Sequence, residues 1–178
     1  DIPDLIRFLD TWGSPYAKPL KKGLKAYQRD GGIMEMEINI DIYINGFILS
    51  QIGKGPDEDL IRDAIVLRID LQNILTLFKI VGEGYSKEGA GGFFIGNGKR
   101  LNRREFMDLS AVDGREELLG NLTAALSDPG IKGVLSSLDT KEMALLEEKF
   151  DDLIQRRLSR LSIIDPLSIA LGAAFIYM

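Results

Sequence analysis

Residues 68–79 read RIDLQNILTLFK and lie in the middle of the pattern that decides the fold. Around them, apolar side chains recur every three to four residues, which is the spacing of one helix face. This face consists of Leu60/Ile61, Ala64, Leu67, Leu71, Ile74/Leu75 and Phe78. Ile65 and Ile69 add apolar surface elsewhere on the helix, which indicates burial on more than one side. The spacing predicts a long helix that is capped by Asp57 or Asp59 and runs to about Val81.

Two helices are predicted near the start of the chain. Residues 1–12 carry apolar side chains at helical spacing. Ser14-Pro15 then resembles a helix start, because Ser is a good cap and Pro is tolerated at the first helical position. Asp30-Gly31-Gly32 is expected to end this second helix.

Residues 33–52 carry conflicting signals. From Met34 to Ile44, apolar residues alternate with polar ones, which favours a strand. The segment is long for a strand, however, and has no turn signal before residues 53–56. Phe47, Ile48 and Ile52 continue at helical spacing. The residues alone favour a strand, but leave a helix open.

A Gly-rich stretch, residues 82–98, is predicted to be a loop. After it, Asn102 is a plausible cap for a helix over residues 103–109, and Glu105 completes a capping box. The loop also contains Gly98-Lys99, as a phosphate-binding P-loop does. The other required residues of that motif are absent, so a flexible connection is favoured, although Lys99 and Arg100 could contact a partner.

Two helices are predicted in the next part of the chain. Asp113 is expected to cap the first, which runs to about Leu126 and is closed by Asp128-Pro129-Gly130. Asp139 is expected to start the second, whose acidic first half and basic last turns match the helix dipole. Its apolar stripe consists of Met143, Leu146, Phe150, Leu153/Ile154, Leu158 and Leu161.

The two ends of the chain indicate a segment of a longer protein. The sequence begins at Asp1 without an initiator Met and ends at Met178 inside an apolar run. Asp165-Pro166 is expected to break the preceding helix and to start a last one. The apolar run of residues 167–178 is nearer in length to a buried helix than to a membrane span of about 20 residues. We expect seven or eight helices and no sheet, which is an all-α fold.

Composition excludes several classes of site. The chain has no Cys and no His, so disulfides, Cys/His zinc sites, Cys nucleophiles and His acid–base catalysis are impossible. The chain has a formal charge of −5, so it lacks the excess of basic residues that a typical nucleic-acid binder has. No set of residues predicts catalysis, a metal site or a cofactor site. Trp12 and Tyr16 are interpreted as core or edge residues rather than as a base-stacking platform.

Two groups of polar residues are candidate sites. Asp70 and Asn73 are three residues apart and share a helix face. They either face a partner or ligand, or tie down neighbouring parts of the fold, and the second interpretation is favoured because buried polar groups need partners. An acidic set is interpreted as a solvated helix face rather than a cation site. It consists of Glu142, Glu147, Glu148, Asp151 and Asp152.

Several segments, in order, resemble the C subunit of archaeal and bacterial A/V-type ATP synthases, which corresponds to the d subunit of vacuolar ATPases. Residues 68–79 resemble its "acidic-x-x-Asn-Leu-x-x-x-x-Arg" helix through Asp70 and Asn73, although Ile74 replaces Leu and Lys79 stands near the usual Arg. Residues 37–43 are similar to its "Glu-x-x-Leu-Asp-x-x-Tyr" helix through Glu37 and Asp41. Residues 14–27, 95–101 and 165–178 resemble further segments of the same family protein. The resemblance makes residues 33–52 a helix.

This resemblance implies a fold and a role. The family protein is all-helical and funnel-shaped, with three similar helical units, of which this chain would be a partial copy with units at residues 1–84 and 85–178. It is not an enzyme by itself. For this chain we expect no cofactor and no metal. It links the rotating shaft to the membrane proteolipid ring, so it is expected at the cytoplasmic face of the membrane, without a transmembrane helix and without nucleic acid. The alternative is a helical interaction or scaffold module, which would bind a protein partner through exposed apolar surface.

Overall fold

The computed structural model describes residues 1–30, 33–83, 85, 87–139 and 144–164. Over these residues it contains nine α-helices, one short 3-10 helix and no strand, so the all-α prediction is confirmed. The chain divides into two compact units, residues 1–52 and 53–178. The repeated helical units that the family resemblance implies, residues 1–84 and 85–178, stay a prediction. No helix within the described ranges is both long enough and apolar enough to cross a membrane.

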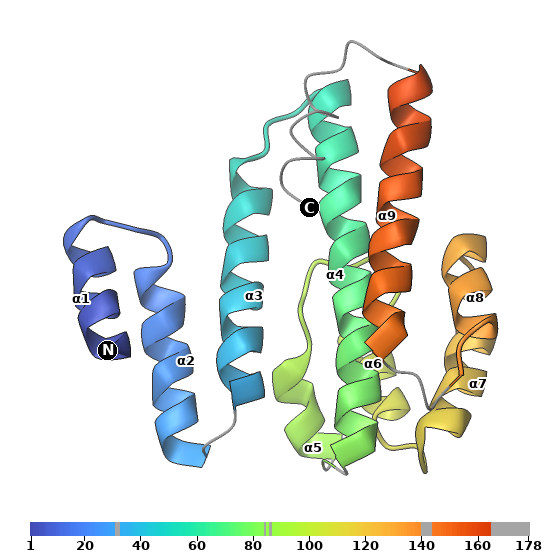
Figure 1. Cartoon of the computed structure of the whole chain (residues 1–178), viewed down its shortest axis with the longest axis horizontal. Coiled ribbons are helices and arrows are strands. Elements are labelled where there is room, and N and C mark those ends of the chain that lie inside the picture. The colour runs from blue at the N-terminus through green and yellow to red at the C-terminus, as the bar shows by residue number, and fades with distance from the viewer. Residues whose placement is uncertain (31–32, 84, 86, 140–143, 165–178) are drawn as a thin grey trace. The chain divides into compact units, whose positions relative to one another are not determined.

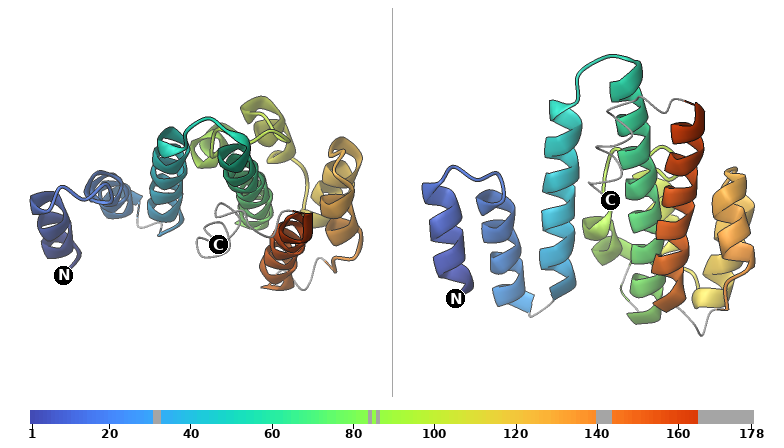
Figure 2. Two further views of the ribbon diagram at one scale, coloured as in Figure 1. Left: turned by 90° about the horizontal axis from the view of Figure 1, so that it is seen from above. Right: turned by 45° about the horizontal axis from the view of Figure 1, so that its top comes forward.

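The first unit consists of α1 (Ile2–Thr11), α2 (Ala17–Asp30) and α3 (Ile33–Gln51), which pack in chain order (Figures 1 and 2). The Asp1 side chain caps α1 by accepting a hydrogen bond of 2.8 Å from the Asp4 backbone N–H. α2 begins at Ala17, later than the predicted Ser14-Pro15 start, and Ser14 Oγ accepts a hydrogen bond from the Tyr16 N–H. The predicted helix of residues 1–12 is thus confirmed, and the start of the second is shifted.

The helix α3 settles the conflict at residues 33–52. The strand favoured by local alternation is wrong, and the helix implied by the family resemblance is confirmed. Alternating apolar residues in a helix point in many directions rather than to one side. Accordingly, Ile38 is buried, whereas Ile33 and Ile42 are exposed.

The second unit is built around α4 (Pro56–Glu83), which contacts α6, α7 and α9 (Figure 1). α4 begins at Pro56, so Asp57 and Asp59 lie inside its first turn instead of capping it. Negative charge there still complements the helix dipole. From Ile65 onward the helix is buried on several sides, as predicted, and Ile69, Ile74 and Phe78 are fully buried.

The remaining helices complete this unit. They are α5 (Lys87–Ala90), η1 (Gly91–Phe93), α6 (Arg103–Leu109), α7 (Arg115–Ala125), α8 (Pro129–Ser136) and α9 (Ala144–Ile164). The loop predicted for residues 82–98 is therefore partly wrong, since it contains α5 and η1. The Asn102–Glu105 capping box at the start of α6 is confirmed, with both of its hydrogen bonds present.

Two caps in the second unit differ from the prediction. Gly114, with φ of 101°, precedes α7 in place of Asp113, because this left-handed backbone suits Gly. Asp128 does not close a helix but caps a new one, α8, which the sequence interpretation missed. Pro129 takes the first helical position, where it costs little.

The helix α9 carries the predicted apolar stripe. Leu146, Phe150, Ile154 and Leu158 are buried, whereas Met143 lies outside the described residues. The last predicted helix, starting at Asp165-Pro166, also lies outside them. α9 contacts both α4 and α8 (Figure 2).

Candidate functional site

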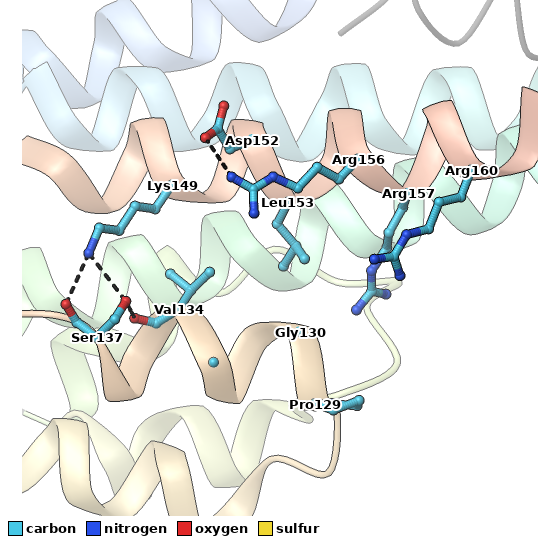
Figure 3. A pocket seen from close by; sticks show the side chains of 11 residues that line it. Pro129, Gly130, Val134, Ser137, Lys149, Asp152, Leu153, Arg156, Arg157 and Arg160 are labelled. Atoms are coloured by element: carbon cyan, nitrogen blue, oxygen red, sulfur yellow. Dashed lines mark hydrogen bonds and ion pairs between the residues drawn. The ribbon is translucent and has the colours of Figure 1, made fainter.

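A groove lies between α8 and α9 and encloses a cavity of about 650 Å³ (Figure 3). Small side chains of α8 form one wall, and long side chains of α9 form the other. The α8 wall consists of Pro129, Gly130, Gly133 and Val134, followed by Ser137. The α9 wall consists of Lys149, Asp152, Leu153, Arg156, Arg157 and Arg160.

Several of these side chains are already held in place. Lys149 Nζ donates hydrogen bonds to the Ser137 carbonyl (3.0 Å) and hydroxyl (3.2 Å), and so joins α9 to the end of α8. Arg156 forms an exposed ion pair with Asp152 at 3.3 Å. Arg157 turns toward the start of α8, where a second polar assembly begins.

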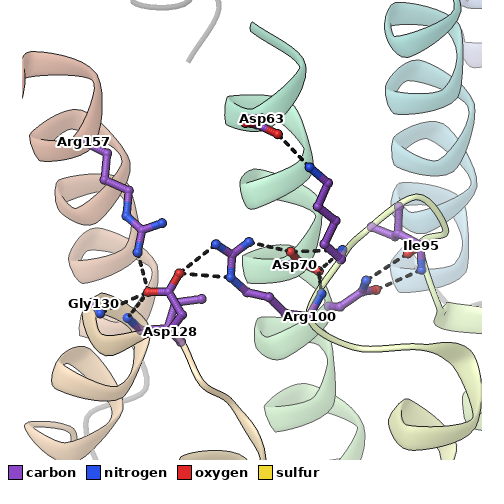
Figure 4. A network of polar contacts seen from close by, with 10 residues as sticks. Asp63, Asp70, Ile95, Arg100, Asp128, Gly130 and Arg157 are labelled. Carbon is purple, nitrogen blue, oxygen red and sulfur yellow. Dashed lines mark hydrogen bonds and ion pairs between the residues drawn. The ribbon is translucent and has the colours of Figure 1, made fainter. Parts of the chain in front are cut away.

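That assembly is a network of polar contacts centred on α4 (Figure 4). Asp70 and Asn73 are fully buried in the middle of this apolar helix. The Asn73 amide donates to the Ile95 carbonyl, the Ile95 N–H donates to Asn73 Oδ1, and both distances are 2.9 Å. One side chain therefore satisfies both backbone groups of a residue that has no regular secondary structure.

Asp70 holds the next part of the same segment. Its Oδ1 accepts hydrogen bonds of 3.0 Å from the backbone N–H groups of Lys99 and Arg100. Its Oδ2 accepts one of 2.9 Å from Arg100 Nη1. The backbone comes so close at Gly98 that a Cβ there would overlap Asp70 Oδ1. Gly98 is therefore required by proximity, whereas Asn97 turns the chain with φ of 73°.

Arg100 connects α4 with the start of α8. Its Nη2 and Nε donate to Asp128 Oδ2 at 2.7 and 3.1 Å, while its Nη1 is bound to Asp70. Partial burial works to lower the pKa of Arg100, but hydrogen bonds to Asp70 and Asp128 and their charges outweigh it and raise the pKa. The guanidinium is therefore a permanent cation between two carboxylates.

Asp128 receives contacts from three parts of the unit. Its Oδ1 caps α8 by accepting hydrogen bonds from Gly130 N–H (3.0 Å) and Ile131 N–H (3.2 Å), and it also binds Arg157 of α9. Burial alone would raise the pKa of Asp128, but the hydrogen bonds from Arg157, Arg100 and the Ile131 backbone lower it to about 2. Asp128 is therefore ionised throughout the physiological range.

The polar network holds separate parts of the second unit together. Two carboxylates face two guanidinium groups, and their oxygens are engaged by N–H donors that tie the segment around residues 95–100 to α4, α8 and α9. Among the described residues, no buried side-chain polar atom lacks a hydrogen-bond partner, and no three carboxylates are grouped so that they could hold a metal ion. The network is a clamp within the second unit.

The structure separates the residues that the sequence singles out. Asp70 and Asn73 meet the same segment of the second unit, and their observed contacts lie inside the fold. Glu37 is exposed and Asp41 is half-buried, and both belong to α3 of the first unit. Lys99, a candidate for a partner contact, forms an exposed ion pair with Asp63 at 2.8 Å.

The structure also bears on the aromatic and acidic residues that the sequence analysis interprets. Trp12 is 76% exposed and Tyr16 is also exposed, so neither is a core residue of the described structure. The acidic residues of α9 are exposed, as a solvated face requires, and Glu142 lies outside the described residues. Sequence reasoning missed Asp128 and Arg157 as members of a partly buried network. The Asp-Pro-Gly sequence could have indicated the cap of α8, but no local signal indicates the arginine partners of Asp128.

Comparisons with known proteins give a consistent result. The family model described as "ATP synthase (C/AC39) subunit" matches residues 1–178. The C subunit of the A-type ATP synthase of Methanocaldococcus jannaschii is 23% identical over 170 residues, which are 94% of this chain and 42% of that protein. The C subunit of the V-type ATP synthase of Thermus thermophilus is 25% identical over 179 residues, covering 99% of this chain and 49% of that protein. The chain thus spans less than half the length of these curated relatives. No solved structure gives a significant match.

Proposed function

The chain belongs to the C/AC39 family of ATP synthase subunits, and from this premise we propose that it acts in the central stalk of a rotary A/V-type ATPase. In this role it links the rotating shaft to the membrane proteolipid ring. It transmits rotation between ATP chemistry in one part of the complex and ion movement in the other, and carries out no chemical step itself. The match of the family model to the whole chain carries this proposal.

The second unit has properties that suit a coupling element. A part that transmits torque must resist the sliding of its helices past one another. The ion pairs of Arg100 with Asp70 and Asp128, and of Arg157 with Asp128, tie together elements far apart in the sequence. They are partly or fully buried, so water and salt screen them less than surface pairs. The clamp therefore supports the mechanical role.

The proposed partners are the shaft subunits and the proteolipid ring, and the proposed location is the cytoplasmic face of the membrane. The family-motif residues divide into two kinds in this proposal. Asp70 and Asn73 maintain the shape of the second unit through their contacts with Ile95, Lys99 and Arg100. Glu37 is exposed on α3 and is a candidate to contact another component of the complex, as is Asp41 on the same helix.

A scaffold role outside any ATPase is the competing proposal, and one feature of the first unit favours it. α1 and the residue after it expose a row of apolar side chains at helical spacing, which is suited to binding a protein partner. This row consists of Ile2, Leu5, Phe8 and Trp12. The same row is compatible with contact inside a rotary complex, so a binding experiment must separate the two proposals.

The test is a pull-down from detergent-solubilised membranes of the source organism, with the full-length native protein as bait and mass spectrometry as the readout. An unrelated all-helical bait of similar charge is the control. Recovery of both shaft subunits and proteolipid with the native bait, and not with the control, is the expected result. If a bait with verified helical circular dichroism recovers neither, the coupling role is wrong and the scaffold role replaces it.

A further inference from the structure

The groove between α8 and α9 has a charge opposite to that of the chain as a whole. Its lining carries four cations and one carboxylate, a formal charge of +3, whereas the whole chain has −5. We infer that this groove is a docking site for an acidic helical segment of a partner polypeptide. The inference stands on the groove alone and is independent of the proposed role in the ATPase.

The arrangement of the cations favours a helix over a small anion. Lys149, Arg156 and Arg160 occupy positions i, i+7 and i+11 of α9, so they follow one face along the helix (Figure 3). At a rise of 1.5 Å per residue this row is about 16 Å long. A helix that presents carboxylates at the same spacing matches such a row, whereas a small anion needs cations that converge on one point.

Two of these cations are available to a partner. Arg160 is exposed and forms no ion pair with any described residue. Within the described part of the chain, Arg156 pairs only with exposed Asp152 in the same helix, and such surface pairs are weak and readily exchanged. Lys149 and Arg157, in contrast, hold α9 to α8. Arg156 and Arg160 are therefore the recognition residues that variants can test, Lys149 completes the row while it also binds Ser137, and Arg157 belongs to the supporting frame.

The α8 wall of the groove leaves room for an occupant at Gly133. No described heavy atom outside its own neighbourhood lies within 4 Å of the place where a Cβ would stand. Gly is a poor helix former, and here no packing contact requires it. Gly130 differs, because its Cβ would lie 2.8 Å from Leu153 Cδ1, so a side chain at this position would displace Leu153. The open space at Gly133 suits a side chain of a docked helix.

The binding test uses the whole 178-residue chain and a synthetic probe. The probe is a fluorescein-labelled, Ala-rich helical peptide with Glu at positions i, i+4, i+7 and i+11. The matched peptide has Gln at these positions. Fluorescence anisotropy in about 50 mM NaCl is expected to show at least about tenfold tighter binding of the Glu peptide, and weaker binding as salt rises.

Three variants locate the binding. The double variant Arg156→Glu/Arg160→Glu is expected to weaken binding of the Glu peptide by about tenfold or more. Lys132→Glu, on α8 but outside the groove lining, makes the same kind of charge change and is expected to leave affinity unchanged. Gly133→Leu keeps every charge and fills the open space beside Gly133, so it is expected to block binding. Circular dichroism establishes that each variant is folded, and Gly133→Leu tests the site even if the double variant fails to fold.

Several results would overturn the inference. One such result is equal affinity of the chain for the Glu and Gln peptides. Another is an affinity for the Glu peptide that changes in neither the double variant nor Gly133→Leu. Displacement of the peptide by pyrophosphate at similar concentration would assign the groove to small oxyanions instead. Binding to anionic phospholipid vesicles that the double variant loses, without peptide binding, would assign it to a membrane surface. The pull-down with the native protein can succeed or fail independently of each of these results.

Discussion

Asp70 and Arg100 are 30 residues apart in sequence, yet the carboxylate of one binds both the backbone N–H and the guanidinium of the other, at 3.0 and 2.9 Å. Asp70 is fully buried, so its charge depends on these contacts for compensation. The guanidinium reaches on to Asp128. The relationship fixes a segment without regular structure against the central helix of the unit.

Asp70→Ala is expected to reduce the free energy of unfolding by about 3–5 kcal/mol, because it leaves Arg100 Nη1 and the backbone N–H groups of Lys99 and Arg100 without their acceptor. Urea unfolding followed by circular dichroism measures the change. Asp63→Ala removes an exposed carboxylate that pairs with Lys99 and is expected to cost less than about 1 kcal/mol. Equal losses in the two variants would contradict a central role for Asp70.

Gly98→Ala is expected to destabilise the protein by about 1–3 kcal/mol, because the new Cβ would overlap Asp70 Oδ1 and would displace either the segment or the carboxylate. Gly96→Ala is the matched control, since no described atom beyond its neighbours lies within 4 Å of that Cβ position. The midpoint of urea unfolding compares the two. A loss of stability in Gly96→Ala as large as in Gly98→Ala would contradict the explanation by proximity.

The polar network makes the free energy of unfolding depend on pH, because the pKa of Asp128 is lower in the folded protein than in the unfolded chain. Its pKa is about 2 in the folded protein and about 3.9 in an unfolded chain, so the folded state favours the charged form. The stabilisation is complete above the unfolded pKa and is lost as the pH falls through the folded one. It amounts to about 2–3 kcal/mol.

Asp128→Asn removes this titration and provides the measurement. Unfolding by urea at several pH values is expected to show a stability difference between parent and variant in neutral buffer that shrinks as the pH falls below the unfolded pKa of Asp. A difference that stays constant down to the folded pKa would be evidence against the lowered value.

Two glycines of α8 are expected to respond in opposite directions to the same change. Gly133→Ala should stabilise the isolated chain by up to about 1 kcal/mol, because Ala is the better helix former and the position is open. Gly130→Ala should destabilise it, since its Cβ would meet Leu153 and Arg157. Thermal unfolding of the two variants compares them directly. The same sign in both would disprove the distinction between a packing glycine and an open one.

The features that sequence can predict are those encoded within a few residues. The capping box of Asn102 and Glu105 is readable because both partners lie within one turn. The long apolar stripes of α4 and α9 are readable for the same reason. At α3, alternation misleads, and only the ordered resemblance to a family indicates a helix. Family membership is recognisable from motif order, although each motif alone is weak.

The features that sequence cannot predict depend on long-range contacts. In the sequence, Asp128 resembles the end of a helix. Its place in the polar network cannot be recognised, because its partners Arg100 and Arg157 are 28 and 29 residues away. Asp70 and Asn73 are recognisable as polar residues on one helix face, but nothing local indicates that Ile95 and Arg100 meet them. The groove between α8 and α9 is not predicted either. The two walls of the groove come from separate helices, and one of these helices, α8, is itself absent from the sequence prediction.

The use of α4 side chains as hydrogen-bond acceptors has a consequence for hydrogen exchange. Ile95, Lys99 and Arg100 belong to a segment without regular structure, yet their backbone N–H groups donate hydrogen bonds to buried oxygens of Asn73 and Asp70. They can exchange with deuterium only when the segment detaches from the helix. The segment and α4 should therefore open together as one cooperative unit, and these three amides should be protected almost as long as the helix amides themselves.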